Sequence, residues 1–124
     1  MTKVLVADDS GTMRAIIVRS LNSLGVTDVV QAEDGTKAVE AFQPGVFDLV
    51  LTDWNMPGKT GLEVIQAIRS QDTTVPVIMI TTESDKARVM QAIQAGVSDF
   101  VVKPFDSKVL REKLAKYNCQ TAAT

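Results

Sequence analysis

Five polar residues of this 124-residue chain have types and positions that could do chemistry together. They follow four separate apolar runs, and they are Asp8, Asp9, Asp53, Thr81 and Lys103. Neighbouring carboxylates repel one another, so a group of them either raises a pKa or binds a cation. Oxygen ligands without sulfur or imidazole favour a hard cation. Mg²⁺ fits this description, because it binds through one or two carboxylates beside a phosphate.

A carboxylate beside Mg²⁺, with an ammonium group nearby, is suited to accepting a phosphoryl group. Asp53 is the expected acceptor, because it ends the buried run LVLT and enters the loop-like segment NMPG. The metal and Lys103 would neutralise charge on the transferring oxygens, and Thr81 would supply a hydrogen bond. A single aspartate more often caps a helix or a turn. Several aspartates at one edge of a sheet favour a metal and phosphoryl site over such capping roles.

These residues meet only if the chain brings the ends of its apolar runs together. Short apolar runs alternate with helical spacing five times, and several runs are continuously apolar, which is typical of buried parallel strands. The predicted strands are Lys3 to Ala7, Val29 to Ala32, Asp48 to Thr52, Pro76 to Ile80 and Phe100 to Lys103. Right-handed crossovers then place helices on both faces, so the predicted fold class is α/β, doubly wound. All strand carboxyl ends share one edge of such a sheet, where ligands bind.

Apolar residues at three- and four-residue intervals predict the five helices. The stripes are Met13, Ile16, Ile17, Leu21 and Leu24; Ala38, Val39 and Phe42; Leu62, Ile65 and Ile68; Ala87, Met90 and Ile93; and Leu110, Leu114 and Tyr117. We expect their methionine and phenylalanine members in the core. Gly25 is the expected left-handed terminator of the first helix.

Composition excludes several classes of function. No apolar run approaches the roughly 18 residues that a bilayer requires, and the first residues do not read as a secretory signal, so we expect a cytoplasmic protein. The chain contains no histidine, which removes histidine-based triads and a common zinc ligand. A net charge of −2 does not favour nucleic acid, and Glu112 interrupts the basic last helix. Cys119 is expected to be an incidental thiol.

Two further motifs are interpreted as structural. The segment PGKTG imitates the end of a phosphate-binding loop, but Asp53 stands where that loop needs its first glycine. Lys59 and Thr60 are therefore expected in a solvated turn. Glu33 and Asp34, followed by a glycine, are expected to lead into a helix start.

The motifs together closely resemble the receiver domains of bacterial two-component response regulators, and among these the chemotaxis type. The resemblance covers residues 3–117 and leaves a polar tail at 118–124, so the predicted receiver domain is residues 1–117. It is carried by VADDS, DWNMP, VIMITT and DFVVKPF at the ends of strands one, three, four and five. The resemblance implies a flavodoxin-like, five-stranded parallel sheet in the order 2-1-3-4-5.

The resemblance also implies what the acidic residues do. Asp53 would be the phosphoacceptor, and Asp9 and Asp53 would ligate Mg²⁺ directly. Asp8 would act largely through water, and Asn55 would add its backbone carbonyl to the metal. The phosphoryl donor would be a phosphohistidine on a histidine kinase, or a small acyl phosphate such as acetyl phosphate. Such a receiver is not a turnover enzyme, because it catalyses only its own phosphotransfer and dephosphorylation.

In similar proteins the phosphoryl group is coupled to a switch. Lys103 and Thr81 would bind the phosphoryl oxygens, and movement of Thr81 would accompany rotation of Phe100. This would alter the surface of the fourth helix, fifth strand and fifth helix for a protein partner, for example a flagellar motor protein or a phosphatase. Chemotaxis receivers carry tyrosine where this chain has Phe100, which removes a hydroxyl from such contacts. Asn55 and Glu83 match positions that influence hydrolysis, and we expect them to favour a short-lived phosphoryl group.

Three alternatives stay open beside a single-receiver switch. The chain could be the amino-terminal receiver of a larger regulator. It could be an aspartyl-phosphate hydrolase of the haloacid-dehalogenase type, although such enzymes place the nucleophile after the first strand. A flavodoxin-like cofactor carrier shares the architecture, but Asp8 and Asp9 would repel a phosphate unless a metal intervened.

Overall fold

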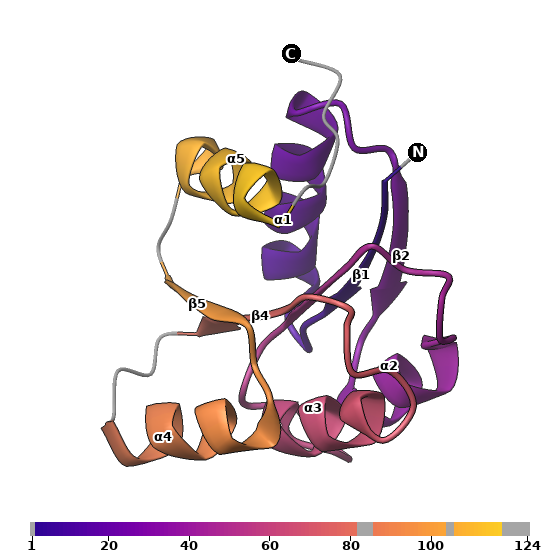
Figure 1. Cartoon of the computed structure of the whole chain (residues 1–124). Helices are drawn as coiled ribbons and strands as arrows, with labels where there is room; N and C mark the ends of the chain where they lie inside the picture. Colours follow the sequence, from indigo (N-terminus) through magenta and orange to yellow (C-terminus); the bar gives the residue numbers. More distant parts are fainter. Residues whose placement is uncertain (1, 82–85, 104–105, 118–124) are drawn as a thin grey trace.

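The computed structural model describes residues 2–81, 86–103 and 106–117, with the side chains of residues 81 and 86 not described. Strands and helices alternate along the chain (Figure 1). Their bounds are β1 Lys3–Ala7, α1 Gly11–Ser23, β2 Asp28–Ala32, α2 Gly35–Ala41, β3 Leu49–Thr52, α3 Gly61–Arg69, β4 Val77–Thr81, α4 Lys86–Ala95, β5 Asp99–Val102 and α5 Ser107–Lys116. Each predicted strand is present, with ends that differ from the prediction by at most one residue.

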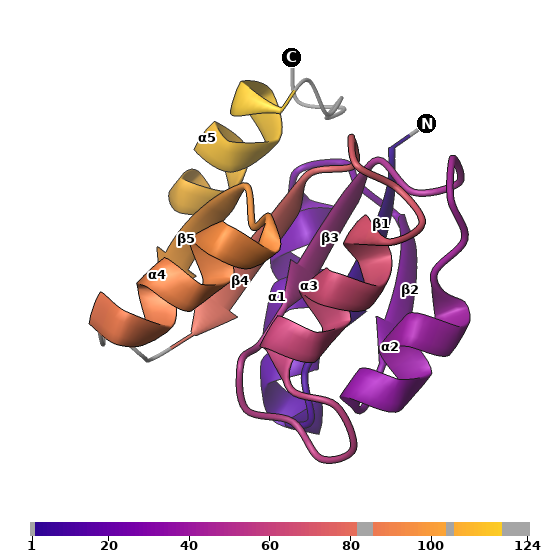
Figure 2. The same ribbon diagram turned by 60° about the horizontal axis from the view of Figure 1, so that its bottom comes forward.

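The strands form one parallel sheet in the order β2-β1-β3-β4-β5. Helices α1 and α5 cover one face and α2, α3 and α4 cover the other, so the molecule has three layers (Figure 1). Figure 2 shows the same arrangement with α3 in front of the sheet and α1 behind it. The doubly wound α/β prediction is therefore confirmed. Among the described helices, none is both long and apolar enough to cross a bilayer.

The strands are continuously apolar because each of their faces has its own core. Along β1, Val4 and Val6 belong to the cluster under α1 and α5, whereas Leu5 belongs to the cluster under α2, α3 and α4. In β4, Ile78 faces the first cluster and Met79 the second. Two helical layers on one sheet thus remove the polar alternation that a half-exposed strand shows.

Helix α1 follows its predicted stripe with one exception. Ile17, Leu21 and Leu24 are buried in the core, whereas Ile16 is 41% exposed. Gly25 follows the helix with φ of 87°, and its N–H donates to the carbonyl of Asn22, as expected of a left-handed helix terminator.

The predicted core stripe of α4 is wrong. Met90 is 51% exposed and Ile93 is 55% exposed, while Ala92 is completely buried and Ala95 is partly buried against the core. The helix therefore turns its alanine side toward α3 and the sheet, since small side chains permit close approach. Met90 and Ile93 remain on the outside of the helix.

Capping side chains begin helices α2 and α3. Asp34 accepts a hydrogen bond from the N–H of Lys37 at 2.7 Å, and Lys37 also pairs with Glu33, which confirms the structural interpretation of this acidic pair. The solvated-turn prediction for Thr60 needs correction. Thr60 caps α3 in a capping box with Glu63, because the two side chains satisfy each other's backbone donors.

A polar network lies at the amino end of β5. The carboxylate of Asp99 accepts hydrogen bonds from Lys113 at 2.9 Å, from Lys116 at 3.0 Å and from the N–H of Phe100 at 2.8 Å. Tyr117 donates to the carbonyl of Ser98 at 2.8 Å. Burial alone would raise the pKa of Asp99, but the hydrogen bonds outweigh burial and hold this pKa at about 2.

The Asp99 network predicts a pH-dependent contribution to stability. The pKa is depressed in the folded state, so the stabilisation is present above the ordinary value of 3.8 and is lost as the pH falls toward 2. We expect Asp99→Asn to lower the free energy of unfolding by about 2 kcal/mol at neutral pH, and by progressively less below pH 4. Urea unfolding measured from pH 7 to pH 3 tests this, with the exposed Asp28→Asn as control. A pH-independent loss would contradict the assignment.

Candidate functional site

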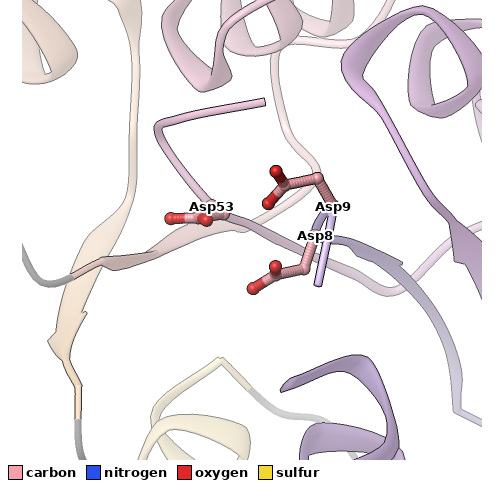
Figure 3. A group of neighbouring side chains, drawn as sticks. All are labelled: Asp8, Asp9 and Asp53. Carbon is pink, nitrogen blue, oxygen red and sulfur yellow. The ribbon is translucent and has the colours of Figure 1, made fainter. Parts of the chain in front are cut away.

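The chemistry-bearing residues gather at the carboxyl edge of the sheet. Asp8 and Asp9 follow β1 and Asp53 follows β3, and one carboxylate oxygen of each lies within 4.8 Å of the others (Figure 3). Lys103 follows β5, and its Nζ lies 2.9 Å from Asp8 and 3.5 Å from Asp53. Three carboxylates and one ammonium group therefore occupy one small volume.

Strand hydrogen bonds that continue past the strand ends place the aspartates. The N–H of Asp53 donates to the carbonyl of Ala7 at 2.9 Å, and the N–H of Asp8 donates to the carbonyl of Ala32 at 3.1 Å. Asp53 is thus held beside the end of β1. Its Oδ1 accepts a hydrogen bond from the N–H of Trp54 at 2.8 Å, which orients the carboxylate.

Asp8 is the most buried of the three carboxylates, with 1% of its surface exposed. Its two oxygens accept hydrogen bonds from the N–H of Ser10 and from Lys103, each at 2.9 Å. The guanidinium of Arg14 donates to the Asp8 carbonyl at 2.7 Å and holds the backbone of the loop. Arg14 was not predicted as a site residue. Arg14 lies in the first turn of α1, directly after the acidic pair, and this position in the sequence could have indicated a role at the site.

The electrostatics of the site favour a bound cation. Burial is the main reason that the pKa of Asp53 is raised, and Asp8 raises it further, while Lys103 opposes the shift. Asp9 is exposed at the rim. One ammonium group cannot balance three carboxylates, and all the available donor atoms are oxygens. The residues therefore fit a hard divalent cation with oxygen ligands.

The structure describes only some of the remaining predicted residues. Asn55 is exposed in the loop after β3, and Phe100 is partly buried against the core under α2, α3 and α4. The backbone of Thr81 ends β4 and pairs with Val102, but its side chain is outside the described part of the chain. Glu83 also lies outside the described residues, as do Cys119 and the tail 118–124.

The loop after β3 is held against the starts of α2 and α3 by close backbone contacts. The N–H of Gly61 donates to the carbonyl of Trp54 at 2.8 Å, and a Cβ on Gly61 would lie 2.2 Å from the carbonyl oxygen of Asp53. At Gly35 a Cβ would lie 1.9 Å from the carbonyl oxygen of Lys59. Glycine is required at both positions because the loop backbone occupies the place of a side chain.

Comparison with known proteins assigns the chain to a protein family. The family model of the response regulator receiver domain matches residues 4–115. The chain therefore belongs to the response regulator receiver domain family, whose members are signalling switches, as its motifs predicted.

Within this family, the similar relatives include chemotaxis proteins. The chemotaxis protein CheY of Pseudomonas aeruginosa is 45% identical over 116 residues, which are 92% of this chain and 94% of that protein. The chemotaxis protein CheY1 of Helicobacter pylori is 49% identical over 115 residues, covering 90% and 93% of the two chains. Among solved structures, CheY4 of Vibrio cholerae matches with a TM-score of 0.86 at 34% identity over 94% of this chain and 98% of that one. The chain is a CheY-like receiver, with a response regulator function in chemotaxis signalling.

Gly61→Ala tests the backbone contact behind Asp53. The added Cβ collides with backbone, which cannot rotate away as a side chain can, so we expect the free energy of unfolding to fall by about 2 kcal/mol or more. Gly11→Ala is a matched control at the first residue of α1, where the nearest atom to a Cβ is a flexible arginine nitrogen 3.8 Å away. Its stability should be unchanged or slightly higher. Equal effects of both substitutions, measured by urea unfolding, would refute the contact.

Lys103→Met tests whether the ammonium group competes with a divalent cation. The buried Asp8 loses its partner, so we expect stability without metal to fall by about 3 kcal/mol. The unneutralised carboxylates should then bind Mg²⁺ more tightly, so that MgCl₂ restores more stability in the variant than it adds to the natural chain. Urea unfolding with and without MgCl₂ measures both effects, with the exposed Lys108→Met as control. An equal gain from MgCl₂ in all three proteins would contradict the competition.

Proposed function

We propose that the chain is a phosphorylation switch in which Asp53 accepts a phosphoryl group in a Mg²⁺-dependent reaction. The observation that carries this proposal is the convergence of Asp8, Asp9, Asp53 and Lys103 at one edge of the sheet. The donor is a phosphohistidine on a histidine kinase, or a small acyl phosphate such as acetyl phosphate.

The transfer needs little from the protein beyond position and charge. An oxygen of the Asp53 carboxylate attacks phosphorus, the bond from phosphorus to the donor nitrogen breaks, and the neutral imidazole leaves after taking up a proton. Lys103, now 3.5 Å from Asp53, is close enough to pair with an oxygen of the new phosphoryl group. Thr81 at the end of β4 is the proposed hydrogen-bond donor to another oxygen.

The metal site uses the same residues. Asp9 and Asp53 would hold Mg²⁺ directly, Asp8 would act largely through water, and the backbone carbonyl of Asn55 would complete the protein's ligands. When bound, Mg²⁺ supplies charge neutralisation on the phosphoryl oxygens. Lys103 keeps the buried Asp8 paired when the metal is absent, which allows the site to exist in both states.

The output is a change in surface and not a released product. The receiver catalyses only its own phosphotransfer and dephosphorylation, and the phosphoryl group shifts a two-state equilibrium by the difference in its affinity for the two states. The proposed partner surface is formed by α4, β5 and α5, where Met90, Ile93 and Val102 are exposed. Phe100, packed against the core beside this surface, is the proposed switch aromatic.

The cellular setting follows from this chemistry. A cytoplasmic location would bring the receiver to the catalytic domain of its kinase, and the downstream partner would be a protein such as a flagellar motor component or a phosphatase. We propose residues 1–117 as the receiver and 118–124 as a polar tail, which the family match over 4–115 supports.

Intact-mass spectrometry after incubation with Mg²⁺ and acetyl phosphate tests the proposed function. We expect one phosphoryl adduct on the natural chain, none after chelation of Mg²⁺, and none on Asp53→Asn. Asp28→Asn, at an exposed position on β2, should be phosphorylated like the natural chain. An adduct that persists on Asp53→Asn would move the acceptor elsewhere, and the absence of any adduct despite confirmed metal binding would refute the proposal for this donor class.

A further inference from the structure

Arg88 of α4 contacts the two residues that directly follow Asp53. The centre of its guanidinium lies 5.3 Å from the centroid of the Trp54 ring. Its Nη1 donates to the Oδ1 of Asn55 at 3.5 Å, across 33 residues of sequence. A cation on α4 thus lies over the loop that carries the proposed phosphoacceptor.

The two contacts differ in character. Trp54 is only 6% exposed, so the guanidinium lies over a ring that is largely removed from water, where a cation–π contact is stronger than at an exposed site. The hydrogen bond to Asn55 is long and, taken alone, weak. Both are made by one planar group, however, so the ring contact holds the guanidinium where it can orient the exposed carboxamide.

Orientation of this carboxamide bears on the loss of the phosphoryl group. In hydrolysis, a water oxygen bonds to phosphorus on the side opposite the Asp53 oxygen, and the bond from phosphorus to Asp53 breaks. The products are the Asp53 carboxylate, inorganic phosphate and one proton. A polar side chain at the rim, two residues from Asp53, can hydrogen-bond the attacking water only if it is held in place. With its Oδ1 engaged by Arg88, the Asn55 carboxamide keeps its N–H donors available in a fixed direction.

We propose that Arg88 is a positioning residue for dephosphorylation of Asp53, acting through Asn55 and supported by its packing on Trp54. This inference rests on the proposed function, because it concerns the reaction at the same aspartate. It adds a residue of α4 to the determinants of phosphoryl lifetime. It also predicts that substitution of Arg88 changes the environment of the loop that follows Asp53.

The first experiment uses the unphosphorylated protein. Trp54 is the only tryptophan of the chain, so intrinsic fluorescence reports on this ring alone. In Arg88→Gln the guanidinium no longer covers the ring, and we expect acrylamide to quench the fluorescence more efficiently than in the natural chain. Arg19→Gln, at an exposed position of α1, is the matched control and should leave quenching unchanged. Equal quenching in all three proteins would overturn the contact on which the proposal stands.

The second experiment measures the decay of the phosphoryl adduct by intact mass after the donor is removed. We expect Arg88→Gln to slow the decay roughly threefold, the size expected when one weak orienting contact is lost. Arg88→Lys should recover part of the rate, since it keeps the charge but loses the planar fork. Arg19→Gln should decay like the natural chain. Circular dichroism and urea unfolding confirm that each variant is folded.

A double-mutant cycle separates action through Asn55 from a general effect of charge. Asn55→Ala alone should slow decay, and Arg88→Gln should then add nothing further. An equal slowing by Arg88→Gln with and without the Asn55 side chain would refute the proposed route. No adduct on the natural chain would refute the proposed function and this inference together, whereas an adduct that decays unchanged in Arg88→Gln would refute the inference alone.

Discussion

The ion pair between Lys103 and Asp8 is the interaction on which the site depends. It joins the end of β5 to the end of β1 across two intervening strands, and it neutralises a carboxylate that is almost completely buried. An unpaired charge at that depth would cost several kcal/mol. Because the same ammonium group also lies near Asp53, any charge that arrives at Asp53 changes the balance that keeps Asp8 in place. Stability and reactivity at this edge are therefore coupled.

The loop that follows Asp53 is closely packed at this edge. The loop after β3 lies against the starts of α2 and α3 so closely that Gly35 and Gly61 cannot carry a side chain without moving it. On the side toward α4, the guanidinium of Arg88 lies over the Trp54 ring and donates a hydrogen bond to Asn55. The loop that directly follows Asp53 therefore contacts α2, α3 and α4.

Much of the fold was predictable because burial on both faces of the strands leaves a strong signal. Runs such as VLV and VIMI contain no polar residue, and they correspond to β1 and β4 within one residue at each end. The fourth helix was the failure. Its larger apolar residues, Met90 and Ile93, suggested a core stripe, yet the core accepts Ala92. Periodicity reports where apolar residues recur, but it does not reveal which side of an edge helix lies close enough to the sheet to require a small residue.

The order of residue types along the chain is enough to predict which polar groups meet. Aspartates and a lysine at the ends of buried parallel strands must meet at one edge, since the topology of such sheets leaves them no other place. How these groups meet is visible only in the folded chain. Lys103 pairs more closely with Asp8 than with Asp53, Arg14 donates to the Asp8 carbonyl, and Arg88 contacts Trp54 and Asn55. These contacts depend on helix orientation and side-chain direction. Local periodicity specifies neither, because the distance between residues far apart in sequence is set by the tertiary packing of the elements that carry them.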